Sequence, residues 1–163
     1  MPYANVNSKS IFYTLTPSVY CSTQDPAPTL VFIHGLGSSS SFYASLVPYL
    51  TALGYHCLTL DTHGSGSSAF TGSKNSIESI ASDVHAILDV LNITENVVLI
   101  GHSMGSIVAS HLAASDLQRR FVAAVLIGPV HPNPAAADVF SKRISAVEKG
   151  KSLSARLTSV PRF

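Results

Sequence analysis

The chain has 163 residues, of which 46% are hydrophobic and 12% are charged, and its formal net charge is +1. This length fits one domain, and the hydrophobic share is enough to fill a core, which excludes a disordered chain. A net charge so close to zero argues against a nucleic-acid-binding protein. No apolar run approaches the ~18 residues of a membrane span, so we expect no membrane partner. The first ten residues lack an apolar signal core, and we therefore expect a cytoplasmic protein.

Charge is distributed unevenly along the chain. Residues 1–141 carry 4 basic and 8 acidic side chains, whereas residues 142–163 carry 6 basic side chains and only Glu148. Residues 150–163 show neither helical nor strand periodicity. We therefore divide the chain into a folded part, residues 1–149, and a basic irregular tail, residues 150–163, that faces water. The two cysteines, Cys21 and Cys57, have the spacing of neither a disulfide framework nor a metal site.

Short apolar segments alternate with longer amphipathic ones. Runs rich in β-branched and aromatic residues predict strands that are buried on both faces, at residues 29–33, 56–60, 96–100 and 121–127. Apolar residues at helical spacing predict helices at residues 42–53, 76–91 and 106–114, and from Pro134 onward. Asn133 is a good N-cap for the last of these helices, whereas Pro48 disturbs the first turns of the first one.

The order strand, helix, strand, helix predicts an α/β fold with a predominantly parallel sheet and helices on both faces. We also expect an edge hairpin between Ile11–Leu15 and the region around Val19. In open parallel sheets the chemistry lies in loops beyond the carboxyl ends of the strands. The loops to inspect are those that follow Ile33, Leu60, Ile100 and Ile127.

Residues 101–105 read Gly-His-Ser-Met-Gly and fit the G-x-S-x-G nucleophile elbow. A serine hydroxyl at the top of a sheet must project from a sharp turn between a strand and a helix. A Cβ at Gly101 or Gly105 would strike the neighbouring strand or helix. The helix that opens at the serine points free N–H groups and the positive end of its dipole at the reaction centre. Ser103 is therefore the candidate nucleophile.

The second motif is His34-Gly35-Leu36-Gly37, at the end of an earlier strand. Acyl transfer needs two N–H donors for the oxyanion that develops on the substrate. One donor is the residue after the nucleophile, here Met104, and the other lies after an earlier strand, here Leu36, where Gly35 lets the backbone approach. A plain glycine turn remains the alternative. We expect His34 to orient this loop rather than to transfer protons.

The third motif, residues 61–68, reads Asp-Thr-His-Gly-Ser-Gly-Ser-Ser. We expect Asp61 to fix this loop as a hydrogen-bond acceptor, and neither Asp61 nor His63 to act directly in catalysis. Residues 64–69 also fit the G-x-G-x-x-A pattern of dinucleotide-binding proteins. However, no helix is predicted to open directly from this loop, and no acidic residue ends a strand about 20 residues further on. Nucleotide binding is therefore the weakest alternative.

Together these motifs resemble the α/β-hydrolase superfamily. They are residues 32–39 (Phe-Ile-His-Gly-Leu-Gly-Ser-Ser), 60–67 (Leu-Asp-Thr-His-Gly-Ser-Gly-Ser) and 101–105, and the resemblance covers about residues 28–148. Residues 126–134 and the helix beyond them resemble the branch that contains the 3-oxoadipate enol-lactonases. The resemblance implies a serine hydrolase with a Ser–acid–His triad and neither cofactor nor metal. It also implies that Ser103 is the nucleophile and that the Met104 and Leu36 N–H groups form the oxyanion hole.

The sequence departs from this family in the rest of the triad. The family's acid and histidine follow the serine, on loops after later strands. Past Ser103 the only candidates are Asp116, Asp138, Glu148, His111 and His131. His111 lies about two turns along the predicted helix, and His131 is a possible surrogate base that precedes any orienting acid. We therefore expect residues 1–149 to be the N-terminal part of a hydrolase domain, an incomplete α/β-hydrolase fold truncated at its C-terminal side.

Two functions follow from this pattern. The first is hydrolysis of a small ester or lactone, possibly like the enol-lactonases, through an acyl-enzyme on Ser103, with the triad acid and histidine missing. The second is an inactive fragment or pseudoenzyme that binds a small carbonyl ligand. The last predicted strand would form a sheet edge with an apolar border at Val122, Val125 and Ile127, so we expect marginal stability and self-association.

Overall fold

The computed structural model describes residues 3–20, 27–130 and 134–149, which form two compact units that divide after Val130. The first unit contains a sheet and its covering helices, and the second contains α4. The strands are β1 (Tyr3–Val6), β2 (Lys9–Thr16), β3 (Thr29–Ile33), β4 (His56–Leu60), β5 (Val97–His102) and β6 (Phe121–Ile127). The helices are the 3-10 helix η1 (Ser40–Tyr43) and the α-helices α1 (Val47–Ala52), α2 (Ile77–Val90), α3 (Met104–Ala114) and α4 (Pro134–Glu148).

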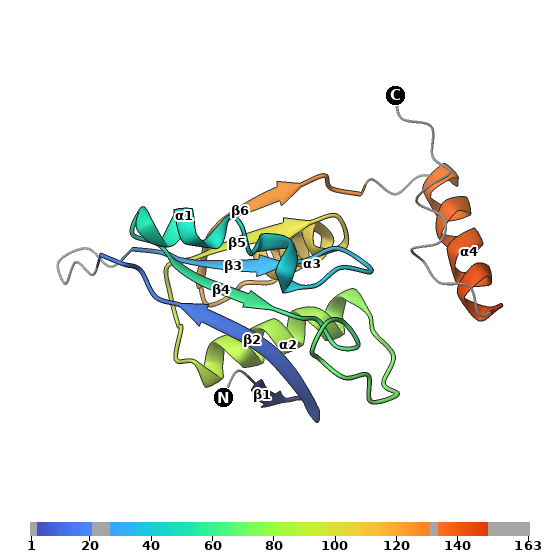
Figure 1. Ribbon diagram of the computed structural model, residues 1–163, viewed down its shortest axis with the longest axis horizontal. Coiled ribbons are helices and arrows are strands. Elements are labelled where there is room, and N and C mark those ends of the chain that lie inside the picture. The colour runs from blue at the N-terminus through green and yellow to red at the C-terminus, as the bar shows by residue number, and fades with distance from the viewer. Residues whose placement is uncertain (1–2, 21–26, 131–133, 150–163) are drawn as a thin grey trace. The chain divides into compact units, whose positions relative to one another are not determined.

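The six strands form one mixed sheet in the order β1-β2-β4-β3-β5-β6 (Figure 1). The pairs β4–β3, β3–β5 and β5–β6 are parallel, whereas β1–β2 and β2–β4 are antiparallel. Connections between parallel strands need a crossover, and here each crossover contains a helix. The predicted α/β fold with a predominantly parallel sheet is confirmed.

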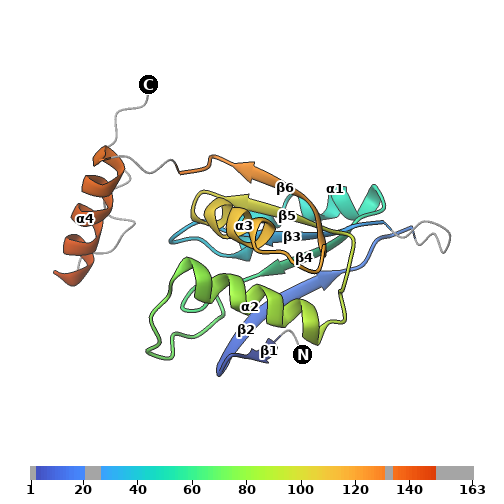
Figure 2. The same cartoon turned by 180° about the vertical axis from the view of Figure 1, so that it is seen from behind.

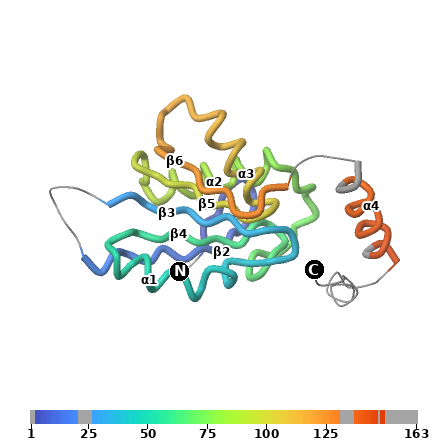
Figure 3. Tube along the Cα trace, turned by 90° about the horizontal axis from the view of Figure 1, so that it is seen from above, coloured from blue at the N-terminus to red at the C-terminus, as the bar shows by residue number. Residues whose placement is uncertain are grey.

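Helices cover both faces of the sheet. Helices α2 and α3 lie side by side on one face (Figure 2), and α1 lies on the opposite face (Figure 3). The α2/α3 face holds the larger core cluster, to which Val31, Ile33 and Leu99 contribute from the sheet. The α1 face holds a smaller cluster that includes Phe32 and Tyr43. Alternation of side chains along each strand sends residues to both clusters, which explains why the parallel strands are continuously apolar.

The N-terminal hairpin differs from the prediction. Ile11–Leu15 does lie in a hairpin strand, but its partner is β1, which precedes it, and not the region around Val19. Asn7 and Ser8 both have positive φ, 49° and 61°, as the two central residues of a tight hairpin turn do. The Val19 N–H instead donates to the Thr51 carbonyl, at 3.1 Å.

The predicted helix over residues 42–53 is also wrong in part, because two shorter helices replace it. The first is η1, and α1 begins only at Val47. Pro48 lies in the first turn of α1, where its missing N–H costs nothing, whereas a helix running through it from residue 42 would lose a hydrogen bond and clash with the preceding turn. The proline therefore starts a helix rather than interrupting one.

The remaining elements agree closely with the prediction. Strands β3, β4 and β6 have the predicted bounds, and α2 is capped by Ser76 and Ser79, which hydrogen-bond reciprocally at 3.1 and 2.9 Å. β5 continues two residues beyond the predicted end, and α3 begins two residues before its predicted start. As a result, Ser103 is the single residue between a strand and a helix.

The second unit contains α4, which begins at Pro134 as predicted. Within it, the Arg143 guanidinium lies 5.8 Å from the centre of the Phe140 ring. The proposed N-cap Asn133, the candidate base His131, Cys21 and the tail 150–163 lie outside the described residues. Within the described ranges, no helix combines the length and apolar character that crossing a membrane requires.

Candidate active site

Ser103 occupies the sharp turn between β5 and α3. Its backbone has φ 52° and ψ −115°, a region that residues with a side chain rarely adopt. The Ser103 N–H donates to the Ile127 carbonyl at 2.9 Å, so the end of β6 fixes this turn. The side chain is partly exposed, and no described residue forms a hydrogen bond with its hydroxyl. The fold therefore presents a hydroxyl that has no partner among the described residues at the carboxyl end of the parallel strands.

Two glycines allow the chain to turn so tightly. A Cβ on Gly101 would lie 2.2 Å from the Gly105 carbonyl oxygen, and a Cβ on Gly105 would lie 2.0 Å from the Ile33 carbonyl oxygen. Both distances are far below contact, and both neighbours are backbone atoms that cannot rotate away. Close packing of β3, β5 and α3 is thus the physical reason for glycine two residues before and two residues after Ser103.

The loop after β3 comes close to the serine. A Cβ on Gly35 would lie 3.2 Å from the Ser103 Cβ, so glycine at this position brings the loop backbone against the elbow. The Ser38 N–H closes the turn on the Gly35 carbonyl at 3.2 Å, while the Leu36 N–H has no partner among the described residues. Met104 is the first residue of α3, and its N–H has no intrahelical partner. The Gly35–Ser103 contact is thus followed on each chain segment by an N–H without a partner among the described residues: Leu36 after Gly35, and Met104 after Ser103.

His34 fixes the loop after β3 through hydrogen bonds of both its ring nitrogens. Its side chain is fully buried, and its Nε2 accepts the Thr62 N–H at 3.0 Å. The Nδ1 therefore carries the proton, which it donates to the Gly35 carbonyl at 2.8 Å. Burial lowers the pKa of His34, so the ring is neutral and both nitrogens are occupied. This geometry agrees with the expectation that His34 orients the loop.

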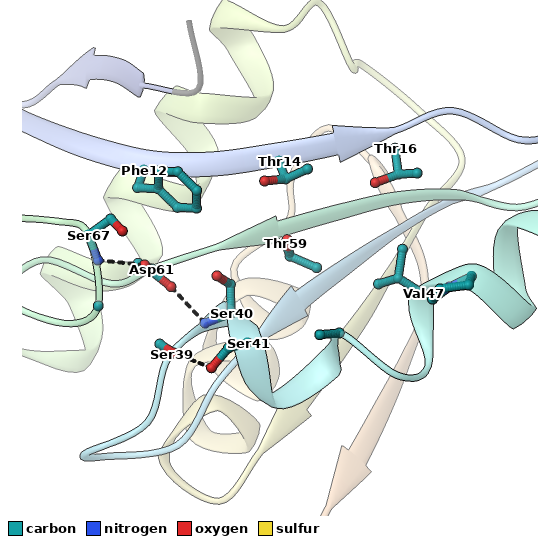
Figure 4. Close-up of a pocket in the computed structure, with 13 residues that line it drawn as sticks. Phe12, Thr14, Thr16, Ser39, Ser40, Ser41, Val47, Thr59, Asp61 and Ser67 are labelled. Atoms are coloured by element: carbon teal, nitrogen blue, oxygen red, sulfur yellow. Dashed lines mark hydrogen bonds between the residues drawn. The ribbon is translucent and has the colours of Figure 1, made fainter.

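Asp61 joins two loops at the carboxyl ends of β3 and β4. One carboxylate oxygen accepts the Ser40 N–H at 2.6 Å, and the other accepts the Ser67 N–H at 2.7 Å (Figure 4). A Cβ on Gly66 would lie 2.1 Å from the Asp61 carboxylate, so this position requires glycine. Asp61 is 2% exposed and acts as an acceptor that fixes both loops, as expected.

The same carboxylate argues against the nucleotide-binding alternative. In a phosphate loop the central glycine leaves room for the pyrophosphate. Here the space beside Gly66 is filled by the carboxylate of Asp61, whose negative charge would repel phosphate. In addition, the next helix, α2, begins only at Ile77 and does not open from this loop. The dinucleotide pattern of residues 64–69 is therefore a structural loop.

His63 is also fully engaged within its loop. Its Nε2 accepts the Thr71 N–H at 2.9 Å, so its Nδ1 donates to the Asn75 side-chain oxygen at 2.9 Å. Asn75 in turn donates to the His63 carbonyl at 2.8 Å. The ring is 1% exposed. His63 therefore stabilises the loop between β4 and α2, and neither of its ring nitrogens is available for proton transfer.

The other candidate bases of the first unit form no hydrogen bond with Ser103. His111 lies in the last turn of α3, and Asp116 accepts the Phe121 N–H at 2.8 Å. Asp138 and Glu148 lie in the second unit. No histidine or carboxylate among residues 3–20 and 27–130 forms a hydrogen bond with Ser103. Within these two ranges, the elbow therefore has no base beside it.

His102 is a residue of interest that the sequence analysis missed. Its ring stacks on Phe42 of η1, with ring centres 4.5 Å apart and an interplanar angle of 16°. Its Nδ1 is buried and has no hydrogen-bond partner in the described part of the chain. Because Phe42 and His102 are 60 positions apart, no local pattern could have linked them. The stack anchors η1 against the elbow.

A cavity of about 530 Å³ lies on the α1 face, between β2, β4 and η1 (Figure 4). Seven of its thirteen lining residues are serines or threonines, which include Thr14, Thr16, Thr59 and Ser40. Ser103 is not among the lining residues, so the cavity is separate from the elbow.

In the described ranges no cluster of three or more His, Cys, Asp or Glu side chains could hold a metal ion. Burial raises the pKa of the Cys57 thiol to about 11, which makes it a poor nucleophile.

The family model described as alpha/beta hydrolase fold matches residues 28–149. The chain belongs to the α/β hydrolase family. This α/β hydrolase is 37% identical over 127 residues to the sn-1-specific diacylglycerol lipase ABHD11 of Xenopus tropicalis, covering 76% of this chain and 38% of the lipase. It is 33% identical over 103 residues to the non-heme haloperoxidase of Rhodococcus erythropolis, covering 63% of this chain and 37% of the haloperoxidase.

Solved structures give the same family. The enol-lactonase of Burkholderia xenovorans LB400 matches this α/β hydrolase with a TM-score of 0.63 and 30% identity, over 72% of this chain and 43% of the enol-lactonase. A hydrolase of Pseudomonas aeruginosa PA01 matches with a TM-score of 0.78 and 24% identity, over 94% of this chain and 54% of that protein, which shows the shared fold. The chain therefore spans about half the length of the relatives that it matches.

Proposed function

We propose that this α/β hydrolase forms an acyl-enzyme on Ser103 with esters or lactones. The observation that carries the proposal is the backbone of Ser103, held at φ 52° between β5 and α3, where no described residue hydrogen-bonds to the hydroxyl. Strain of about 1–3 kcal/mol at such a residue persists only where the surrounding structure imposes it, and functional sites are where it gathers. Here Gly101 and Gly105 impose it.

In the proposed reaction the Ser103 Oγ forms a bond to the substrate carbonyl carbon. The negative charge that develops on the carbonyl oxygen accepts hydrogen bonds from the Leu36 and Met104 N–H groups. The tetrahedral intermediate then expels the alcohol, or opens the lactone ring, and water later releases the acid. The serine proton passes to water, because no described residue of the first unit provides a base. Oxyanion binding without a base supports roughly 10³–10⁴-fold acceleration over water.

The relatives support a carbonyl substrate. A lipase and an enol-lactonase both act on acyl–oxygen bonds, and each covers more than two thirds of this chain. Because the chain spans about half of these relatives, we propose the bond type from them and the nucleophile from the geometry of this chain. An enol-lactone is the natural first lactone to assay.

Labelling by a serine-reactive fluorophosphonate tests the nucleophile directly. We expect the wild-type chain to be labelled at one site and to release a burst of p-nitrophenol from an activated ester, because this leaving group departs without a proton. Ser103→Ala is expected to lose both signals. Ser110→Ala, which removes an exposed hydroxyl from the same helix, is the matched control and should keep both. Absence of labelling and burst in the wild-type chain, or labelling that survives Ser103→Ala, contradicts the proposal.

A second candidate function is binding without turnover. It is favoured by the missing base beside Ser103 among the described residues, together with an intact elbow. Under this alternative a lactone binds saturably and is recovered unchanged, and no phosphonate label forms. Calorimetric titration with the lactone, followed by analysis of the recovered ligand, distinguishes the two functions.

A further inference from the structure

The cavity on the α1 face is a separate place in the fold from both the Ser103 elbow and β6. All thirteen of its lining residues belong to the first unit and fall between Phe12 and Ser67. They come from β2, β4, η1, α1 and the adjoining loops, and β3 and β5 lie between β4 and β6 in the sheet. Its volume of about 530 Å³ is typical of small-molecule sites and much larger than one water molecule requires. The cavity therefore has room for a ligand.

Thr59 supplies this cavity with a buried hydroxyl that has no partner. The residue is 8% exposed and lines the cavity, and no described residue forms a hydrogen bond with its side chain. Thr59 is opposite Thr14 in the antiparallel pair of β4 and β2, and Figure 4 shows it between Thr14 and Ser40 of η1. Buried polar groups in native proteins are almost always hydrogen-bonded, and each exception needs an explanation. A polar ligand in the cavity would give this hydroxyl its partner.

Other hydroxyls of the lining are also without a partner among the described residues. They belong to Thr14, Thr16, Ser40 and Ser67. Thr14 and Thr16 are two positions apart on β2 and so share one face of the strand, next to Thr59. Ser40 and Ser67 lie in the two loops that Asp61 fixes through their N–H groups. Because a hydroxyl both donates and accepts, these five residues suit a ligand whose own groups do both.

The charge of the lining excludes an anionic ligand. Asp61 is acidic, and none of the thirteen lining residues is basic. Each Asp61 oxygen accepts one N–H and has room for a second donor, so the carboxylate favours ligand hydroxyls and repels phosphate or carboxylate groups. A wholly apolar ligand would remove water from the lining hydroxyls without replacing its hydrogen bonds. Apolar C–H groups on the ligand would nevertheless find contacts, because the lining also includes Phe12, Ala44, Val47 and Pro48.

We propose that this cavity binds a neutral sugar, whose hydroxyls hydrogen-bond to Thr59, Thr14 and the Asp61 carboxylate. A sugar ring combines several groups that donate and accept with C–H groups that pack against apolar side chains. A neutral sugar also carries no charge for Asp61 to repel. The site does not include Ser103, and the proposal is independent of the proposed function.

Amide NMR spectra recorded during titration with a sugar test the site, with glucose, galactose and mannose as the probes. We expect at least one of them to shift the amide signals of Thr14, Ser40 and Thr59 saturably, and to leave that of Ser103 in place. The corresponding uronate, which adds a carboxylate to the same ring, is expected to lose the saturable shifts. Thr59→Val keeps the shape of the side chain but removes its hydroxyl. It is expected to raise the dissociation constant about threefold or more, because a hydrogen bond is lost.

Thr29→Val is the matched control, because Thr29 lies in β3 and does not line the cavity. It should bind the sugar like the wild type. Thr14→Val changes an exposed position of β2, so it should weaken binding without unfolding the chain even if Thr59→Val is unstable. Absence of saturable shifts with all three sugars overturns the proposal. So do shifts that gather around Ser103 instead of the cavity, and a dissociation constant that both Thr59→Val and Thr14→Val leave unchanged.

Discussion

Gly105 shows how a single residue determines the elbow. Its missing side chain lets α3 approach β3 closely, and a Cβ here would lie 2.0 Å from the Ile33 carbonyl oxygen. We expect Gly105→Ala to lower the free energy of unfolding by at least about 3 kcal/mol, the upper end of overpacking costs, because backbone atoms must move. Urea denaturation measures the change.

Gly54→Ala is the control for Gly105→Ala. Gly54 has φ 100° but no atom within 4 Å of its hypothetical Cβ, so only backbone conformation is penalised. Its expected cost is about 1–2 kcal/mol. Equal destabilisation by the two substitutions would mean that close packing at Gly105 is unimportant.

The lowered pKa of His34 predicts how the free energy of unfolding depends on pH. Burial lowers the pKa of the folded His34 below its ordinary value of 6.5. As the pH falls through about 6.5, the unfolded chain binds a proton that the folded chain does not, so the free energy of unfolding decreases. Urea midpoints measured from neutral to acidic pH should show this loss, and His34→Gln should flatten it. The pKa of His85 is also lowered by burial, so His85→Gln accounts for part of the remaining slope. A slope unchanged by His34→Gln contradicts the assignment.

At the scale of elements, a buried ion pair ties the hairpin to α2. The Lys9 ammonium lies 2.8 Å from the Asp83 carboxylate, and both side chains are less than 10% exposed. Asp83→Asn leaves the lysine charge buried without its partner and is expected to cost about 3–5 kcal/mol. Glu78→Gln, an exposed change on the same helix, should stay within about 0.5 kcal/mol. Melting or urea curves of the two variants compare them.

A double replacement separates the pair from its surroundings. Exchanging Lys9 and Asp83 together for Met and Leu removes both charges and keeps an apolar contact between β2 and α2. Such exchanges are often neutral or stabilising. We therefore expect the double variant to be much more stable than Asp83→Asn alone. Equal losses in both would show that a feature other than the unpaired charge causes the cost.

At the scale of the whole molecule, stability should be highest at the centre of the sheet. β3 lies between β4 and β5, both faces are covered, and Val31 and Phe32 are fully buried. We expect their amide hydrogens to exchange only through global unfolding, whereas those of β1, at the edge of the sheet, exchange through local opening. Hydrogen exchange in low urea measures this difference. Similar exchange rates for Val31 and Asn5 would contradict it.

The sequence by itself determined those elements whose signals lie in residues that are neighbours along the chain. Continuous apolar runs predicted β3, β4 and β6, and Ser76 predicted the start of α2, because burial on both faces and capping depend on neighbours along the chain. The G-x-S-x-G spacing predicted the elbow for the same reason. Residues 42–53 gave a weaker signal, since leucine spacing and a proline support opposite conclusions until packing decides between them.

Only the tertiary structure decided what depends on residues far apart in the chain. It paired β2 with β1 rather than with the region around Val19, stacked His102 on Phe42, and set Asp61 between the loops of Ser40 and Ser67. It also occupied both nitrogens of His34 and His63, which excludes them as bases. The physical reason is that partners such as Asp61 and Ser40, 21 positions apart, or Phe42 and His102, 60 positions apart, leave no period in the sequence, whereas the strain of a turn is encoded in the residues that form it.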